Sequence, residues 1–210
     1  MKKILHVILI SLFSLTIISC AKKSNTSSSS SSEGSAVTTL AGTGSSGSAD
    51  NSTGTLASFS RPRGITRDGT NLYVADTYNH LIRKIVISTG VVTTLAGTGS
   101  SGSADNSTGT SASFKDPMGI TTDGTNLYVA DFSNHLIRKI VISTGVVTTV
   151  AGKLWGGAGD PGSANGTGTS ASFNGPNGIT TDGTNLYVSE RNNHLIRKIV
   201  ISTGVVTTLA

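Results

Sequence analysis

The strongest constraint on the fold of this chain is a segment that is written three times. The letters NHLIRKIVISTGVVTT occupy residues 79–94, 134–149 and 193–208 of the 210. Residues 38–92 and 93–147 align without a gap and differ at seven positions, whereas the third copy, 148–206, carries four additional residues in its loop. A repeat of this length is a supersecondary unit that buries its apolar surface only by packing on its neighbours. The sequence therefore predicts a propeller or a solenoid.

Each copy consists of short β-type runs separated by turn-forming residues. In the first copy these runs are residues 64–67, 72–75, 80–87 and 91–96, in which β-branched or alternating apolar residues dominate. Turns rich in Asp, Asn and Gly separate them, and a Gly/Ser-rich loop leads to the next copy. Four short antiparallel strands at this period describe a propeller blade, so we expect an all-β fold of about three four-stranded blades.

Composition excludes the main alternatives. Charged residues make up 13% of the chain and aromatic residues 5%, unlike the Ala-, Glu-, Lys- and Leu-rich composition of a helical bundle. A single Cys excludes a disulfide scaffold. Hydrophobic residues, at 36%, are gathered in short runs between Gly-rich turns, which favours strands over disorder.

Residues 1–19 have the pattern of a secretory signal peptide, because a positively charged start precedes an apolar run too short for a comfortable bilayer span. The letters IIS precede Cys20, and this order resembles a bacterial lipobox. The resemblance implies cleavage before Cys20 and attachment of a diacylglycerol to its thiol; the alternative is an ordinary signal peptide with an incidental Cys. Residues 20–35 contain six consecutive serines and are predicted to be a flexible tether.

The lipobox resemblance also implies a location. A lipid anchor would hold the protein in the bacterial cell envelope, since each buried methylene contributes about 0.8 kcal/mol to membrane attachment. Ala21 stands where some bacteria use Asp to retain lipoproteins at the inner membrane, which favours the outer membrane. The membrane is thus the first expected partner.

The net charge of +5 is no sign of a nucleic-acid-binding protein. Lys2, Lys3, Lys22 and Lys23 lie within the first 35 residues, where Glu33 is the only acidic residue. Residues 36–210, the predicted propeller segment, are therefore nearly balanced in charge. Because nucleic-acid binding needs a concentrated basic face, we expect no nucleic-acid partner.

The letters TNLYVAD-x-x-NHLIRKI, preceded by F-x-x-P-x-GIT-x-DG and followed by TTLAG-x-G, closely resemble the NHL repeat. The resemblance covers about residues 37–210, with repeats at about 38–92, 93–147 and 148–206. It implies a β-propeller, usually of six blades, that binds proteins, RNA or other ligands. Propellers with related blades also include lyases and hydrolases.

The number of blades does not close a ring, since propellers typically have four to eight. The outer-strand letters VTTLA appear at 37–41, before any complete blade, and again at 206–210. We interpret the chain either as a shortened repeat array or as a half-ring that pairs with a second copy to give six blades. The sequence favours shortening over dimerisation. An open arc would expose the apolar sides of its end blades.

The histidines recur once per copy and so spread around an arc, whereas a metal needs ligands that converge on one centre. We expect each His to hydrogen-bond the turn carboxylate four residues before it. The Asp50–Asn51 and Asp105–Asn106 pairs lack the ligand spacing of a calcium loop. No metal, cofactor or catalytic residue is predicted. Structural roles are assigned to Asp76, Asn79, His80, Asp131, Asn134, His135, Glu190, Asn193 and His194.

Six of the seven differences between the first two copies fall in two connections, the loop entering the first strand and the turn between the second and third strands. In a blade of alternating strands these connections emerge at the same end, and divergent residues on a fixed framework are typical of a binding surface. Neutral drift in tolerant loops is the alternative. The candidate ligand residues are Arg61, Arg63, Tyr78, Lys115, Met118, Phe132, Trp155, Asn177 and Arg191.

The sequence thus predicts a surface-anchored, non-enzymatic module that binds a protein or a glycan through its loops. One alternative is a propeller enzyme of the lyase or hydrolase type with a metal in its channel. The other is a truncated repeat product without a distinct activity.

Overall fold

The computed structural model describes residues 36–155 and 158–210. Contacts divide the chain into two units, Met1–Val37 and Thr38–Ala210, and the fold described below is that of the second unit. The predicted signal peptide, the lipidation site Cys20 and the tether lie outside the described residues. Among the residues described, no helix is long and apolar enough to cross a membrane.

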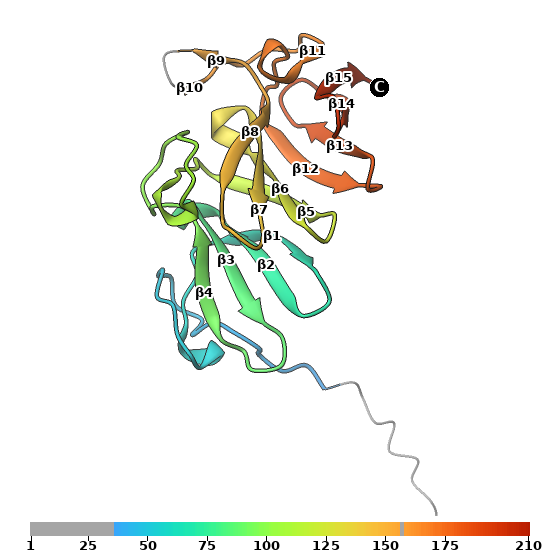
Figure 1. The fold of residues 1–210 in the computed structure, drawn as a ribbon. Coiled ribbons are helices and arrows are strands. Elements are labelled where there is room, and N and C mark those ends of the chain that lie inside the picture. Colours follow the sequence, from blue (N-terminus) through green and yellow to red (C-terminus); the bar gives the residue numbers. More distant parts are fainter. Residues whose placement is uncertain (1–35, 156–157) are drawn as a thin grey trace, which may run out of the picture. The chain divides into compact units, whose positions relative to one another are not determined.

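The fold is all-β, with three antiparallel sheets that each correspond to one repeat (Figure 1). Blade 1 consists of β1 (Pro62–Arg67), β2 (Asn71–Asp76), β3 (Leu81–Val86) and β4 (Val92–Ala96). Blade 2 consists of β5 (Pro117–Thr122), β6 (Asn126–Asp131), β7 (Leu136–Val141) and β8 (Val147–Ala151). Blade 3 consists of β12 (Pro176–Thr181), β13 (Asn185–Glu190), β14 (Leu195–Val200) and β15 (Val205–Thr208), with β11 (Gly166–Thr167) beside β15. The predicted blades are confirmed.

The remaining elements are short. The inserted loop of the third repeat forms a hairpin of β9 (Leu154–Trp155) and β10 (Ala158–Gly159). Single 3₁₀ turns follow β2 and β6, at η2 (Thr77–Asn79) and η4 (Phe132–Asn134). Three more lie in the long loops, at η1 (Gly54–Leu56), η3 (Gly109–Ser111) and η5 (Gly168–Ser170).

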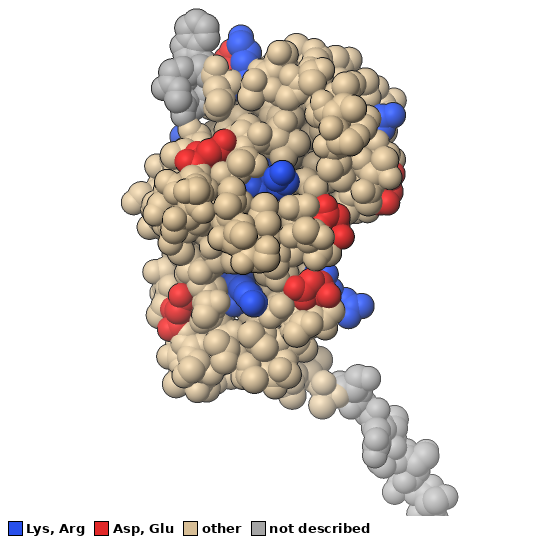
Figure 2. All heavy atoms as spheres, in the orientation of Figure 1, with Lys and Arg blue, Asp and Glu red and all other residues tan. Residues whose placement is uncertain are grey.

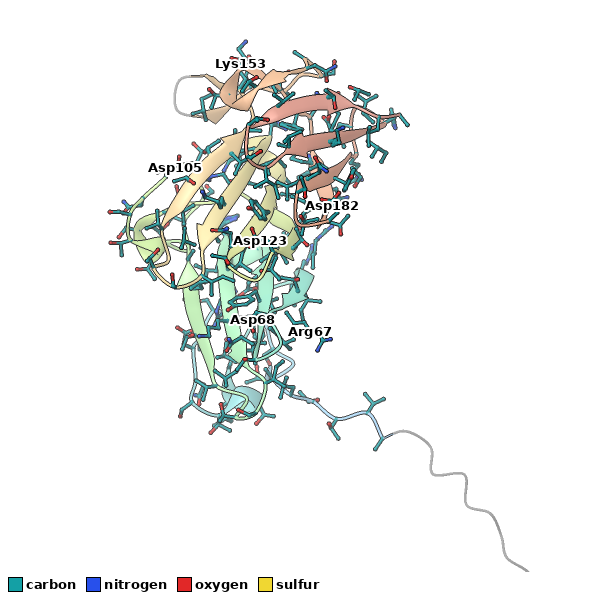
Figure 3. All side chains as sticks on the ribbon, turned by 45° about the vertical axis from the view of Figure 1, so that its right-hand side comes forward. Arg67, Asp68, Asp105, Asp123, Lys153 and Asp182 are labelled. Atoms are coloured by element: carbon teal, nitrogen blue, oxygen red, sulfur yellow. The ribbon has the colours of Figure 1, made fainter. Side chains whose placement is uncertain are left out.

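Side-chain hydrogen bonds explain why the first hairpin of each blade forms where it does. The Asp68 carboxylate accepts hydrogen bonds from the backbone N–H of Thr70 at 2.9 Å and of Asn71 at 2.7 Å. The Tyr73 hydroxyl donates to the same carboxylate at 2.7 Å. Asp123 and Asp182 repeat this arrangement in the equivalent turns, which Figure 3 labels. Asp in these turns is therefore structural, as its turn-forming preference predicts.

The long Gly/Ser-rich loops are part of the blades. The N–H and C=O of Asn51 both bond to Val92 in β4, at 3.2 and 2.9 Å, and Asn106 pairs with Val147 in the same way. In blade 3 this contact lengthens into β11. Each loop thus adds an edge contact to the outer strand of the blade that follows it, which shields an otherwise open edge.

The blades pack face to face through two apolar cores. We call the side of a blade that contacts the following blade its leading face, and the side that contacts the preceding blade its trailing face. Tyr73, Ala75 and Ile82 on the leading face of blade 1 pack against Phe114 and Ile120 on the trailing face of blade 2. Blades 2 and 3 repeat this core with equivalent residues. The first strands lie side by side, β1 next to β5 and β5 next to β12.

The ring of blades is not closed within residues 36–155 and 158–210 (Figure 1). Residues 37–41 carry the outer-strand letters but form no strand, unlike the same letters in β4. The physical reason is that in blade 1 the strand β3 lies beside β4, whereas residues 37–41 have no third strand next to them to complete a ladder.

Candidate ligand-binding face

Two connections of each blade meet at one end of the sheet, and we call this end the loop face. In blade 1, the N–H of Tyr78 in the second-to-third connection donates to the C=O of Ser60 in the loop before β1, at 3.1 Å. Ser133 bonds to Lys115 at the same distance in blade 2. The two variable connections are therefore one continuous surface in each blade.

An exposed pair of side chains stands out on the loop face of blade 1. The Arg61 guanidinium lies over the Tyr78 ring, 4.4 Å from its centroid, and Nη1 donates to the Tyr78 hydroxyl at 2.9 Å. Tyr78 is 48% exposed. Such a pair combines a cation, an aromatic face and hydrogen-bond donors in a fixed arrangement.

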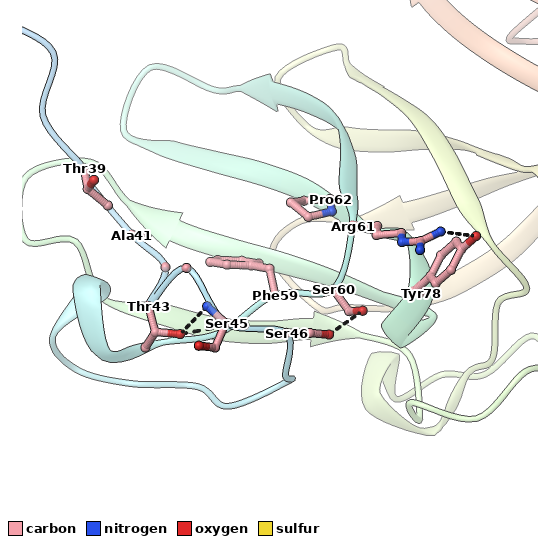
Figure 4. Close-up of a pocket in the computed structure, with 12 residues that line it drawn as sticks. Thr39, Ala41, Thr43, Ser45, Ser46, Phe59, Ser60, Arg61, Pro62 and Tyr78 are labelled. Atoms are coloured by element: carbon pink, nitrogen blue, oxygen red, sulfur yellow. Dashed lines mark hydrogen bonds between the residues drawn. The ribbon is translucent and has the colours of Figure 1, made fainter.

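A pocket of about 820 Å³ opens beside this pair (Figure 4). Hydroxyls line it, and Ser46 Oγ donates to Ser60 Oγ at 2.9 Å across its floor. Phe59 and Pro62 supply an apolar wall. Ser46 was not among the predicted ligand residues because its equivalent in the second repeat is also Ser, whereas Ser60 differs from its equivalent, Lys115.

The structure separates the other predicted ligand residues into exposed and occupied ones. Arg63, Lys115 and Arg191 are exposed, and Asn177 is partly buried. Two of these residues contact the neighbouring blade: Met118 is 7% exposed, with Arg63 Nη1 3.8 Å from its sulfur, and the ring of Phe132, which is partly buried, lies against Gly175. Both side chains therefore contribute to the packing between blades. Trp155 lies in β9, and its side chain is outside the described part.

The turn carboxylates organise a buried polar cluster. Asp76 Oδ2 accepts hydrogen bonds from Asn79 Nδ2 at 2.8 Å and from Arg83 Nη1 at 2.9 Å, and Oδ1 accepts from the Ser60 N–H at 2.7 Å. Asp76 and Arg83 are both fully buried. Asp131 and Glu190 hold the same partners in blades 2 and 3. The predicted structural residues Asp76, Asn79, Asp131, Asn134, Glu190 and Asn193 thus fix the turns of the loop face.

The cluster also accounts for the acidic residues of the long loops. Arg83 Nη2 donates to Asp50 Oδ1 at 2.6 Å, and Thr94 N–H donates to the other oxygen of Asp50 at 2.9 Å. Arg83 also donates to the C=O groups of Ser58 and Ala49, both at 3.0 Å. The guanidinium therefore lies inside its own blade, where it holds the long loop against the turn that follows β2.

His80 and His135 bridge blades, which corrects their predicted partner. His80 Nδ1 accepts a hydrogen bond from the N–H of Asp116 in blade 2 at 3.2 Å, and His135 Nδ1 accepts from Gly175 in blade 3 at 3.1 Å. The turn carboxylates are unavailable to them because Ser60, Asn79 and Arg83 or their equivalents already occupy both oxygens. Burial, followed by the charge of Lys115, lowers the pKa of His135, which keeps the ring neutral and able to accept.

Within the described residues, no group of three His, Cys, Asp or Glu side chains is placed to hold a metal ion. Charged side chains are sparse on the face shown in Figure 2, where both signs are dispersed over an otherwise uncharged surface. What the loop face offers chemically is therefore stacking, hydrogen bonding and isolated positive charges.

Comparisons with known proteins agree with this architecture. Residues 59–85 match the family model of the NHL repeat. NHL repeat-containing protein 2 of Homo sapiens is 40% identical over 101 residues, which is 46% of this chain and 14% of the human protein. The chain thus matches a small part of that relative.

Two proteins of Bacteroides thetaiotaomicron with solved structures resemble this chain in fold. An auxiliary nutrient binding protein is 25% identical with a TM-score of 0.56, over 69% of this chain and 36% of that protein. A protein of unknown function from the same organism is 29% identical with a TM-score of 0.55, over 62% of this chain and 32% of the other. This chain covers about a third of each.

Proposed function

We propose that this propeller of NHL repeats is a non-enzymatic binding module that takes a protein or glycan ligand on its loop face. The observation that carries the proposal is the exposed Arg61–Tyr78 pair beside the hydroxyl-lined pocket. Aromatic and Arg side chains are the types that dominate binding energies at interfaces. The likeness to a nutrient binding protein supports a binding role at the level of the fold.

The charges of the loop face favour a ligand with acidic groups. Each blade presents at least one exposed cation on this face: Arg61 and Arg63 in blade 1, Lys115 in blade 2 and Arg191 in blade 3. Asp116 follows Lys115 in the chain, and its carboxylate accepts a hydrogen bond from Ser133 Oγ at 2.7 Å. A protein segment or glycan bearing carboxylate or sulfate groups would therefore meet donors on all three blades.

We expect Tyr78→Ala to weaken binding of an acidic glycan or acidic peptide about tenfold or more, because it removes both the stacking face and the hydroxyl that orients Arg61. Binding of the full-length protein to an array of acidic and neutral glycans and peptides measures this. Arg67→Ala is the matched control: Arg67 is an exposed cation and the last residue of β1, at the opposite end of the blade (Figure 3). Equal losses in the two variants, or none in Tyr78→Ala, would refute the assignment of the face.

We further propose that Cys20 carries a lipid that anchors the module in the bacterial cell envelope, at the outer membrane. The support is the lipobox-like order before Cys20 and the serine-rich segment after it. In bacteria that express the full chain, Cys20→Ser should move the protein from the membrane fraction to the soluble fraction. A variant that still sediments with membranes would count against lipidation as the anchor.

A further inference from the structure

The two end blades each carry half of an interblade core. The trailing face of blade 1 gathers Ala57, Val74, Ile85 and Val92, with Phe59 partly buried against them. At the internal junctions an equivalent set is covered by the Tyr, the small residue and the Ile of a leading face. The leading face of blade 3 presents that second half, because Tyr187, Ser189 and Ile196 line an open groove of about 310 Å³.

The exposure of equivalent residues shows that each end blade lacks the neighbouring blade that covers the same positions at the internal junctions. Ile65 on the trailing face of blade 1 is 58% exposed, whereas its equivalent Ile120 is 5% exposed. Ile196 on the leading face of blade 3 is 41% exposed, whereas its equivalents Ile82 and Ile137 are fully buried. Since the repeats have nearly the same sequence, the difference comes from the absent neighbour and not from the residues.

The two end blades also hold an unused donor and acceptor in the conformation that the internal junctions use. The N–H groups that donate to His80 and His135 belong to Asp116 and Gly175, whose φ angles are 51° and 63°. Arg61 occupies the same position in blade 1 and holds the same left-handed conformation, with φ of 48°. In blade 3 the matching imidazole is that of His194, also at positive φ. Within the described chain, the Arg61 N–H has no His of a preceding blade to donate to, and the His194 imidazole has no N–H of a following blade to accept from.

The space around the glycines of the first strands is also consistent with a further blade packed against blade 3. A Cβ placed on Gly64 or Gly119 would fall on the backbone of the following blade, so these glycines allow close approach of the first strands. At Gly178, the equivalent in blade 3, the nearest atom is Ser189 Oγ of the same blade, at 2.9 Å. The first strand of blade 3 is therefore shaped for a neighbouring strand.

We propose that two copies of this chain join head to tail, the leading face of blade 3 of each copy docking on the trailing face of blade 1 of the other. Two such contacts close a ring of six blades, within the range of propellers. Each contact continues an interface that the chain already makes twice internally, with His194 of one copy accepting from the Arg61 N–H of its partner. The contact is argued without reference to a ligand, but it shares Phe59, Thr39 and Ala41 with the pocket beside Arg61, so pairing of two chains would reshape one wall of that pocket.

One segment must move for this contact to form. A Cβ added to Gly54 would lie 2.5 Å from the Leu40 carbonyl oxygen. At the internal junction, a Cβ added to Gly109 would lie 2.6 Å from the carbonyl oxygen of Leu95 in β4. Residues 37–41 thus rest where the outer strand of a preceding blade belongs. The partner's residues 206–210 have the same letters and would take this place, displacing residues 37–41, which make no ladder of their own.

The test is the mass of the full-length protein, purified in detergent and measured by light scattering with correction for detergent. We expect two chains for the wild type and one chain for Ile65→Arg and for Ile196→Arg, because each places a charge in the apolar contact. Leu56→Arg is the matched control, since Leu56 is 59% exposed and its equivalents are exposed Ser residues, and it should stay dimeric.

Three outcomes would overturn the proposal. A wild type of one chain at micromolar concentration would show that the two faces do not bind each other. Open polymers whose mass grows with concentration would show head-to-tail contact without closure. A dimer that survives both Ile substitutions would place the interface elsewhere. Urea unfolding of each variant confirms that the blades remain folded, which both exposed Ile positions allow.

Discussion

Arg138→Met should lower the free energy of unfolding by about 3–5 kcal/mol, because it leaves a buried carboxylate without its cation. Arg138 is fully buried in the central blade, where Nη1 donates to Asp131 Oδ2 at 2.9 Å and Nη2 donates to Asp105 Oδ1 at 2.7 Å. The same two nitrogens donate to the C=O groups of Ser113 and Ala104 at 3.0 Å. Met preserves much of the apolar volume but none of these four bonds. Urea unfolding followed by circular dichroism measures the loss.

The loss should depend on pH in a defined direction. Burial raises the pKa of Asp131 to about 6 in the native protein, although Arg138 lowers it. Without Arg138, the pKa of Asp131 in the folded protein rises further. As the pH increases above 6, the variant therefore continues to lose stability, whereas the contribution of Asp131 to the stability of the wild type no longer changes. The difference between the two proteins should therefore be larger at pH 8 than at pH 6.

Lys139→Met is the matched control, because Lys139 is the next residue of β7 and its side chain lies on the other face of the sheet, partly exposed. It should change the free energy of unfolding by less than about 0.5 kcal/mol. Equal effects of the two substitutions, or a loss for Arg138→Met that shrinks with rising pH, would contradict the role given to the guanidinium.

The repeat predicted the fold because the period, the turn residues and the alternation of strand residues all specify the same blade. The structure places β2, at Asn71–Asp76, and β3, at Leu81–Val86, within one or two residues of the runs read from the sequence. Local chemistry determines these boundaries, as the Asp68 hydrogen bonds to its own turn illustrate. Long-range partners had no such local signal.

The roles of Arg83 and His80 show where local reasoning stops. Arg83 bonds to Asp50, which is 33 residues earlier, through a loop whose path the letters do not specify. His80 bonds to Asp116 in the next blade, although a carboxylate lies four residues before it in the chain. Both contacts depend on how blades and loops stack, and identical residues in every copy give no hint of which neighbour they meet.

The positions that differ between copies include both exposed loop-face residues and residues that contact the next blade, because the sequence alone does not show which neighbour a side chain meets. A position that faces the next blade can vary when its partner varies, as Arg63 and Met118 do where they meet, and this resembles variation at a binding surface. Tyr78 and Lys115 vary and are exposed, whereas Phe132 varies and lies against Gly175. Only the contacts across the blade junction separate the two classes.

Gly119→Ala should destabilise the protein by about 3 kcal/mol, at the upper end of what an added methyl costs in a close-packed contact. Its Cβ would fall on the C=O of Asn177 and come within 3.2 Å of Gly178 Cα, both in blade 3. These are backbone atoms of β12 and cannot rotate away, so blades 2 and 3 must separate to admit the methyl group. Heat and urea unfolding should both show the loss, at every protein concentration.

Gly178→Ala provides the matched control, since the same substitution at the equivalent position meets only Ser189 Oγ, which can turn aside. In single chains at high dilution it should leave the free energy of unfolding unchanged. At concentrations where two copies associate it should weaken their contact, because the methyl group then meets the partner's first strand as that of Gly119→Ala meets β12. If both variants lost the same stability at high dilution, the cost would lie in the strand itself and the blade junction would not explain these glycines.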